Sequence, residues 1–311
     1  MKALIISKNQ ILCIGFFICF QVDASSHFYT RVAIDSRSIS TVNNGTKTDI
    51  ASNESKFGLK GKLLLDQASK TKFIFQIEYG FNPLDGKARG QDGTFEQRNT
   101  FIGLENNLGT LFAGTHDSAL KNSQLNIDLF NDLAPDIKHI LHGENRLEDF
   151  IGYTTPRFQG EFSATINSIK NPFLSGKRYK SYSMNYSGDN FQAAFALDEA
   201  MKGYDSSRLS FLYPFKNSKL GLILQKTTKL SSGDDESGEV VSFAKKFKSK
   251  GTFKIQYASS SMKVKSGKHA TIGYDHQLRN NLKLFTYYSM MNSKTNRKDK
   301  NIFSLGFECN L

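Results

Sequence analysis

Tryptophan is absent from the 311-residue chain, and proline and cysteine are scarce, with five and three residues respectively. Two of the cysteines, Cys13 and Cys19, precede residue 24, which leaves Cys309 alone in the rest of the chain. A single cysteine forms no intramolecular disulfide, so residues 25–311 are expected to depend on their fold alone. The chain after residue 24 also lacks any run of about 18 apolar residues, which excludes a transmembrane helix there.

The N-terminus has the order of parts of a secretory signal peptide. A short basic region precedes an apolar run at residues 11–20, and Val22-Asp23-Ala24 has the small residues of a cleavage site. The apolar run is too short to span a bilayer as a helix. We therefore expect residues 1–24 to be a signal peptide and residues 25–311 to form the exported domain.

Basic side chains outnumber acidic ones, with 41 Lys and Arg against 29 Asp and Glu and a formal net charge of +12. Such a balance often indicates nucleic-acid binding, but an export signal argues against nucleic acid as a partner. We expect outer-membrane lipid, lipopolysaccharide phosphates and small charged solutes as partners instead.

Period-2 alternation dominates the exported part of the chain. Between residues 72 and 81, the odd-numbered positions from Phe73 to Phe81 are apolar or aromatic, while Lys72, Gln76 and Glu78 lie on the other face. No helix has this pattern. Similar segments lie at residues 28–37, 55–65, 95–104, 110–116, 150–156, 160–169, 179–186, 191–197, 207–213, 220–227, 239–247, 251–259, 269–277, 282–290 and 302–311.

The connections between these segments alternate in expected length. Tight turns are expected at residues 66–70, 106–109, 157–160, 187–190, 214–219, 248–250 and 278–281. Longer polar loops are expected at residues 40–53, 82–94, 117–146, 170–178, 199–206, 230–238, 260–268 and 292–301. Short connections on one side and long ones on the other are typical of outer-membrane barrels.

These patterns predict an all-β protein, a transmembrane antiparallel up-and-down β-barrel of about 16 strands. An even strand number lets the first and last strands pair, so that no edge remains. A soluble β-sandwich is the alternative, and it would predict Greek-key connections without the strict alternation of loop lengths. Aromatic residues near the strand ends favour the barrel, because they suit interfacial girdles.

Residues 117–146 form the longest of the expected loops and show no sustained strand alternation. A segment of this size inside a compact domain indicates a functional loop. It carries Asp128, Asp132 and Asp136 at four-residue spacing.

Several segments resemble the general porins of Gram-negative outer membranes. They are Ser55-Lys56-Phe57-Gly58-Leu59-Lys60-Gly61, Phe75-Gln76-Ile77-Glu78-Tyr79-Gly80-Phe81, Gln97-Arg98-Asn99-Thr100-Phe101-Ile102-Gly103-Leu104, Leu108-Gly109-Thr110-Leu111-Phe112-Ala113-Gly114 and Gly152-Tyr153-Thr154-Thr155-Pro156. The resemblance covers the first half of the exported chain, and in the second half it depends on strand rhythm and loop length.

This resemblance implies a homotrimer of sixteen-stranded barrels whose third long loop, residues 117–146, folds inward and narrows the channel. It also implies a basic ladder on the barrel wall that faces acids on the loop. The matching basic positions are Arg31, Lys56, Arg98 and Arg146, and the matching acids are Asp132 and Asp136 on the loop and Glu78 on the wall.

Strand phase supports part of this assignment without the resemblance. Lys56 alternates with Phe57, and Glu78 alternates with Ile77 and Tyr79, so both charges point into the lumen if the aromatics face lipid. Arg98 fits less well, because its phase would leave Gln97 and Asn99 facing outward.

The resemblance implies passive diffusion of small hydrophilic solutes and ions through a water-filled pore, with no enzyme activity and no cofactor. The alternatives are a substrate-specific channel and an outer-membrane barrel enzyme of the lipase or protease type. An enzyme would need Ser/His or Asp/His groups within hydrogen-bond reach, and the six histidines form no such motif. His139 and His142 with Asp136 would form a metal site only if that part of the loop is helical.

Overall fold

The computed structural model describes residues 24–42, 45–86, 94–170, 178–263, 267–293 and 299–311. The expected signal peptide therefore lies outside the described residues, except for Ala24. Within the described ranges, no helix is long and apolar enough to cross a membrane.

Nearly all of the described chain is antiparallel β-strand. The strands of the first half are β1 (Ala24–Thr41), β2 (Gly45–Ser52), β3 (Lys56–Asp66), β4 (Thr71–Gly80), β5 (Glu96–Gln97), β6 (Thr100–Asn106), β7 (Gly109–Asp117), β8 (Arg146–Thr154) and β9 (Phe162–Lys170). Those of the second half are β10 (Arg178–Ser187), β11 (Gln192–Met201), β12 (Tyr204–Phe215), β13 (Ser218–Lys229), β14 (Asp235–Lys246), β15 (Gly251–Ser260), β16 (Gly267–Arg279), β17 (Leu282–Ser293) and β18 (Lys300–Asn310). A short helix α1 (Ala119–Asn122) and a 3-10 turn η1 (Ile137–His139) lie between β7 and β8.

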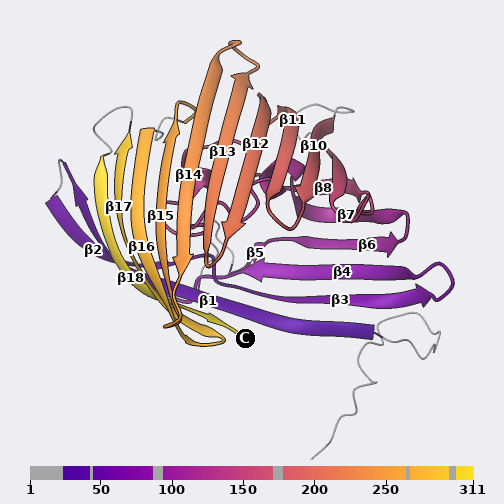
Figure 1. Ribbon diagram of the computed structural model, residues 1–311, viewed down its shortest axis with the longest axis horizontal. Helices are drawn as coiled ribbons and strands as arrows, with labels where there is room; N and C mark the ends of the chain where they lie inside the picture. Colours follow the sequence, from indigo (N-terminus) through magenta and orange to yellow (C-terminus); the bar gives the residue numbers. More distant parts are fainter. Residues whose placement is uncertain (1–23, 43–44, 87–93, 171–177, 264–266, 294–298) are drawn as a thin grey trace, which may run out of the picture.

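The sheet closes on itself (Figure 1). β1 pairs with β18 on one side and with β2 and then β3 on the other. β4 likewise pairs with β6 and with the short β5. Because β2 runs on into β3 and β5 into β6, the described strands make a closed barrel of sixteen strand positions, which confirms the predicted fold and strand number.

Backbone hydrogen bonds extend the closure to the last residue of the chain. Leu311 and Thr30 exchange two of them, at 2.8 and 2.9 Å. The start of β1 and the end of β18 therefore lie at the same end of the barrel as the tight turns.

Two of the expected long loops are wrong. Residues 40–53 are mostly strand, because β1 continues to Thr41 and β2 begins at Gly45, so the two form a β-hairpin. Residues 199–206 contain only the turn Lys202-Gly203 between β11 and β12. Polar composition suggested loops at both places, but polar strands that extend beyond the bilayer meet water on both faces and need no apolar alternation.

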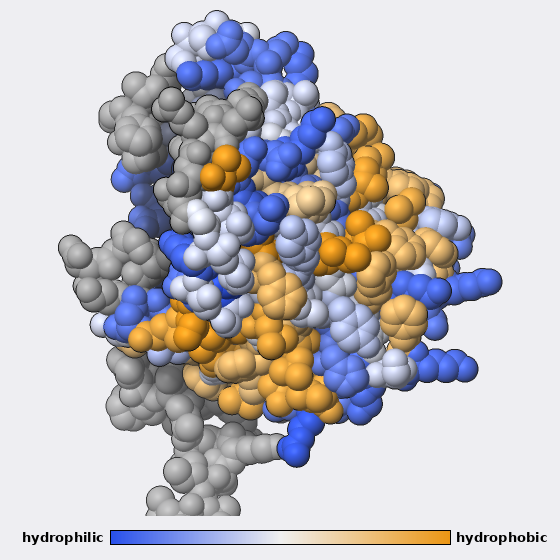
Figure 2. Space-filling model, turned by 90° about the vertical axis from the view of Figure 1, so that its left-hand side faces the viewer, coloured by the Kyte–Doolittle hydropathy of each residue, from blue (hydrophilic) through white to orange (hydrophobic). Residues whose placement is uncertain are grey.

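The two faces of the wall differ as the alternation predicts. On β12, Leu209, Phe211 and Tyr213 are exposed, while Arg208, Ser210 and Leu212, which alternate with them, are buried. The exposed residues form the outward face, and Figure 2 shows hydrophobic residues gathered over part of one side, bordered by hydrophilic ones. This arrangement suits an outer surface in contact with lipid.

Candidate pore constriction

The long segment between β7 and β8 lies against the inner face of the wall. Its apolar side chains Ile127, Ile137, Ile140 and Leu141 are fully buried. They pack on inward-facing residues of four neighbouring strands and the following loop, namely Leu212, Ile223, Val240, Ala258 and Met262. A second contact joins Phe130 and Leu133 to β17 and β18, through Phe285, Tyr287, Met291 and Ile302.

Glycines on the wall allow this segment to approach closely. A Cβ atom on Gly221 of β13 would lie 2.8 Å from Cγ2 of Ile127, and one on Gly273 of β16 would lie 2.8 Å from Cε1 of Phe130. Both distances are too short for a side chain. The inner wall is therefore shaped to receive the segment.

The two ends of the segment are held by polar contacts with the wall. At its start, the backbone N–H groups of Ala119 and Leu120 donate to Asn167 Oδ1 (2.7 Å) and Ser181 Oγ (3.1 Å). Near its end, Arg208 of β12 pairs with Glu144 at 2.8 Å and donates to the carbonyl oxygen of His142. Arg208 is fully buried, and a buried guanidinium with these partners positions the backbone firmly.

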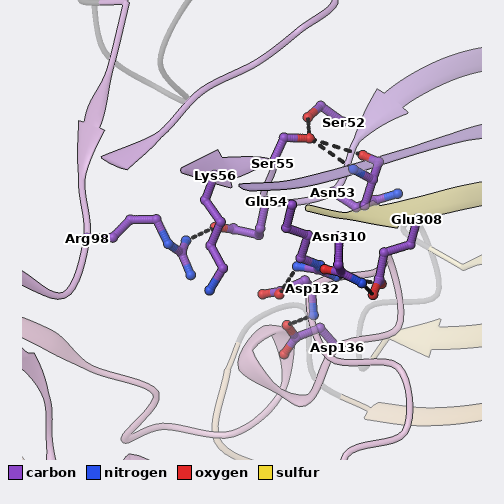
Figure 3. A network of polar contacts seen from close by, with 12 residues as sticks. Ser52, Asn53, Glu54, Ser55, Lys56, Arg98, Asp132, Asp136, Glu308 and Asn310 are labelled. Carbon is purple, nitrogen blue, oxygen red and sulfur yellow. Dashed lines mark hydrogen bonds and ion pairs between the residues drawn. The ribbon is translucent and has the colours of Figure 1, made fainter. Parts of the chain in front are cut away.

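The opposite edge of the segment carries charge and faces β1 and β3 (Figure 3). Arg31 of β1 pairs with Asp132 at 2.6 Å and with Glu308 of β18 at 3.1 Å. Lys138 of η1 pairs with Glu54 at 3.2 Å. These ion pairs join the segment directly to the wall.

Wall charges continue this network along β3 and β4. Arg98 pairs with Glu78 at 2.8 Å and also with Glu54, and Lys56 pairs with Glu78 at 3.1 Å. Tyr29 of β1 donates to Glu78 at 2.8 Å. Arg98 therefore faces inward despite its strand phase, because the chain leaves the ladder between β5 and β6, at residues 98–99.

The inward-facing lysines on β3 and β4 are exposed to solvent. The inner face of β12–β16 is instead covered by the buried segment. The side chains of Lys62 and Lys72 are 52% and 43% exposed, and both pair with Glu105 of β6. The buried segment thus occupies one side of the lumen, and solvent reaches the wall on the other side.

A family model for Gram-negative porins matches residues 22–296, which is most of the chain. The chain belongs to the Gram-negative porin family. Its membership places it in the outer membrane. The matched family is a family of porins and not of enzymes.

Two comparisons describe how far this porin resembles known proteins. Major outer membrane protein P.IB of Neisseria gonorrhoeae is 28% identical over 182 residues, which cover 56% of this chain and 49% of that protein. The chain thus spans about half the length of the curated relatives it matches. An anion-selective porin from Comamonas acidovorans superposes with a TM-score of 0.73 at 18% identity, over 93% of this chain and all of that one. OmpF of Salmonella typhi, in complex with daunomycin, superposes with a TM-score of 0.72 at 14% identity, over 92% of this chain and 97% of that one. These structures share the fold.

The structure brings six of the seven candidate site residues of this porin into one network: Arg31, Lys56, Glu78, Arg98, Asp132 and Asp136. Asp136 joins the network through Lys138, whose Nζ lies 3.3 Å from its carboxylate. It is 2% exposed, and its oxygens accept from the N–H groups of Asp132 and Lys138, both at 2.7 Å. Its carboxylate therefore shapes the loop more than it lines the lumen.

Arg146 lies apart from the acids on the loop. It pairs with Asp117 at 3.0 Å and donates to Asn99 at 2.8 Å. This places it at the base of the loop, where β7 and β8 diverge. Its role as a member of the basic ladder stays a prediction.

Sequence reasoning missed three charged residues that complete the network, Glu54, Lys138 and Glu308, and also Arg208, which pairs with Glu144 at the other side of the segment. The phase of β18, in which Glu308 alternates with the outward Phe307, could have identified that acid. Glu54 and Lys138 lie outside the β-strands, so no alternation of apolar and polar residues could have identified them.

The histidines of the loop make contacts of other kinds. Within the described ranges, no three His, Cys, Asp or Glu side chains are grouped as metal ligands. The His142 ring stacks on Tyr204 at 4.0 Å, and its Nε2 lies 2.9 Å from the carbonyl oxygen of Met262. Burial and Lys263 lower the pKa of His142.

We expect the docking of the loop to depend on pH through Asp128. This residue accepts from the N–H groups of Phe130 (3.0 Å) and Ile137 (3.1 Å), and burial together with Asp136 raises its pKa to about 8. An undocked loop would return this carboxyl towards 3.8. The docked state keeps Asp128 protonated to a higher pH than the undocked state does. The free energy of docking therefore becomes less favourable as the pH rises from about 4 to about 8.

We expect open-channel current noise from loop motion to increase between pH 6 and pH 9. The equilibrium constant for docking of the loop on the wall should fall by up to about tenfold per pH unit until about pH 8. Single-channel recordings in planar bilayers measure this. Asp128→Asn removes the titration and keeps the oxygen that accepts from Phe130 but not the one that accepts from Ile137, so its noise should differ in level from that of the parent protein and stay constant over the range. Equal pH dependence in both proteins would contradict the assignment.

Proposed function

We propose that this porin forms a water-filled channel for the passive diffusion of small hydrophilic solutes and ions, narrowed by residues 117–146. The observation that carries the proposal is the packing of the loop against the inner faces of β12–β18, opposite a wall with exposed lysines. A lumen filled on one side and hydrated on the other admits small polar solutes and excludes large ones.

Charge at the constriction supports selection by polarity as well as by size. Arg31, Lys56 and Arg98 lie close to Asp132 and Glu78 within a few ångströms. Fixed charges of both signs orient water strongly, so an apolar solute has to displace ordered water to pass. Cations and anions are nearly balanced here, and the network alone favours neither sign of ion.

An aromatic cluster on the outside of the barrel supports assembly with other copies of the chain. Phe57 lies 6.4 Å from Phe28, 6.2 Å from Tyr79 and 5.5 Å from Phe95, measured between ring centroids. Phe28 is 64% exposed. We infer that this surface of β1, β3 and β4 packs against a neighbouring subunit of a homotrimer, since an exposed apolar patch marks a contact with protein or with membrane and a structurally similar OmpT of Vibrio cholerae has a trimer form.

Purified protein added to a planar bilayer should produce ohmic channels that close in three equal steps, one for each subunit. The measurement is single-channel current under a salt gradient, which also reports ion selectivity. A folded protein that carries no current would overturn the channel proposal. Currents that saturate with one solute would favour a substrate-specific channel instead.

A further inference from the structure

Six exposed cations gather on three neighbouring turns at the end of the barrel that holds the chain termini. They are Lys216 in the turn between β12 and β13, Lys245 and Lys246 at the end of β14, Lys248 and Lys250 in the turn that follows it, and Arg279, the last residue of β16 before the turn to β17. We call these six residues the turn cation cluster. Residues 213–220, 244–252 and 276–283, which contain these turns, include no Asp or Glu.

The other tight turns at this end differ in charge. Each has an acid in the turn or within two residues of it, namely Asp66, Glu105, Glu161 and Asp189. The excess of positive charge is therefore local to β12–β17 and does not simply reflect the net charge of the protein.

Hydrogen bonds between strands hold the three turns together. The N–H of Lys246 donates to the carbonyl oxygen of Asn217 at 2.7 Å. The N–H of Gln277 donates to the carbonyl oxygen of Lys250 at 3.0 Å. The cations are thus displayed along one continuous rim and not on independent loops.

An aromatic band on the outward face lies next to this rim. The rings of Tyr213 and Phe215 lie 5.6 Å apart, and Phe215 and Phe243 lie 6.3 Å apart. Lys245 follows Phe243 on the same outward face and places its Nζ 5.7 Å from the centre of the Phe247 ring. Aromatic residues prefer the depth of the lipid headgroups, and lysines beside them extend towards phosphates.

We propose that the turn cation cluster binds the phosphodiester headgroups of anionic phospholipids in the leaflet on the turn side, which is the periplasmic side in barrels of this kind. The alkyl stems pack along the aromatic band while the ammonium and guanidinium groups reach the phosphates. The site is independent of the pore and of its selectivity.

Native mass spectrometry of the detergent-solubilised protein, titrated with phosphatidylglycerol or with neutral phosphatidylcholine, tests this site. The variant Lys245→Gln/Lys246→Gln/Lys248→Gln should bind phosphatidylglycerol at least about tenfold more weakly and phosphatidylcholine as before. Lys248→Gln alone should weaken phosphatidylglycerol binding by about threefold, so the test does not depend on the triple variant folding.

The matched control removes three exposed lysines from the opposite end, Lys170→Gln/Lys180→Gln/Lys226→Gln. Each of these pairs with an acid, at 3.4, 3.3 and 2.8 Å, and the change in net charge is the same. The control should change phosphatidylglycerol binding by less than about twofold. Equal losses in the two triple variants, unchanged binding in the turn variants, or a preference for soluble anionic polymers over phosphatidylglycerol would each overturn the proposal.

Discussion

Replacing residues 119–144 by a short glycine linker is expected to raise the single-channel conductance about twofold or more. The deleted segment carries all the apolar side chains that fill the lumen beside β12–β18. Without it, the pore is limited by the width of a sixteen-stranded barrel, which is an aqueous channel. Planar bilayer recordings in the same salt solution measure the change.

A matched deletion shows whether the effect belongs to this loop. Shortening residues 230–234, between β13 and β14, removes a connection that does not enter the lumen contacts and should leave the conductance unchanged. If deleting residues 119–144 also left the conductance unchanged in a folded protein, the loop would not be the constriction.

Asp132→Asn and Arg31→Gln are expected to shift ion selectivity in opposite directions. The two side chains pair at 2.6 Å and are each 16% exposed, so each change leaves an unbalanced charge beside the path of ions. A unit charge about 4 Å from a passing ion in water changes its free energy by about 1 kcal/mol, or roughly fivefold in permeability. Asp132→Asn should favour anions, and Arg31→Gln should favour cations.

Reversal potentials under a salt gradient measure these shifts. Asparagine suits position 132 because this residue has a φ of 68°, which asparagine tolerates. The double variant should return close to the original selectivity. Asp149→Asn, which removes an acid that is 64% exposed on the outside, is the control. Unchanged selectivity in both single variants would show that Arg31 and Asp132 do not line the path.

Particular residues show how far sequence reasoning reached. The alternation around Phe73 and Glu78 predicted which face of β4 is outward, because one residue in a strand determines the direction of the next. The same argument was less clear at Arg98, since the ladder is interrupted between β5 and β6. Asp132 and Asp136 looked equivalent in the sequence, but only Asp132 reaches Arg31, while Asp136 accepts backbone N–H groups within the loop.

The sequence by itself determined the barrel, the positions of most strands, the inward and outward faces of the wall, and the one segment too long to be an ordinary connection. These features follow from local periodicity and composition. Only the tertiary structure decided where residues 117–146 lie in the lumen, which acids meet which cations, and that Glu54, Lys138 and Glu308 belong to the network. Such pairings join residues up to 277 positions apart, and no local pattern records them, because they depend on the closure of the sheet.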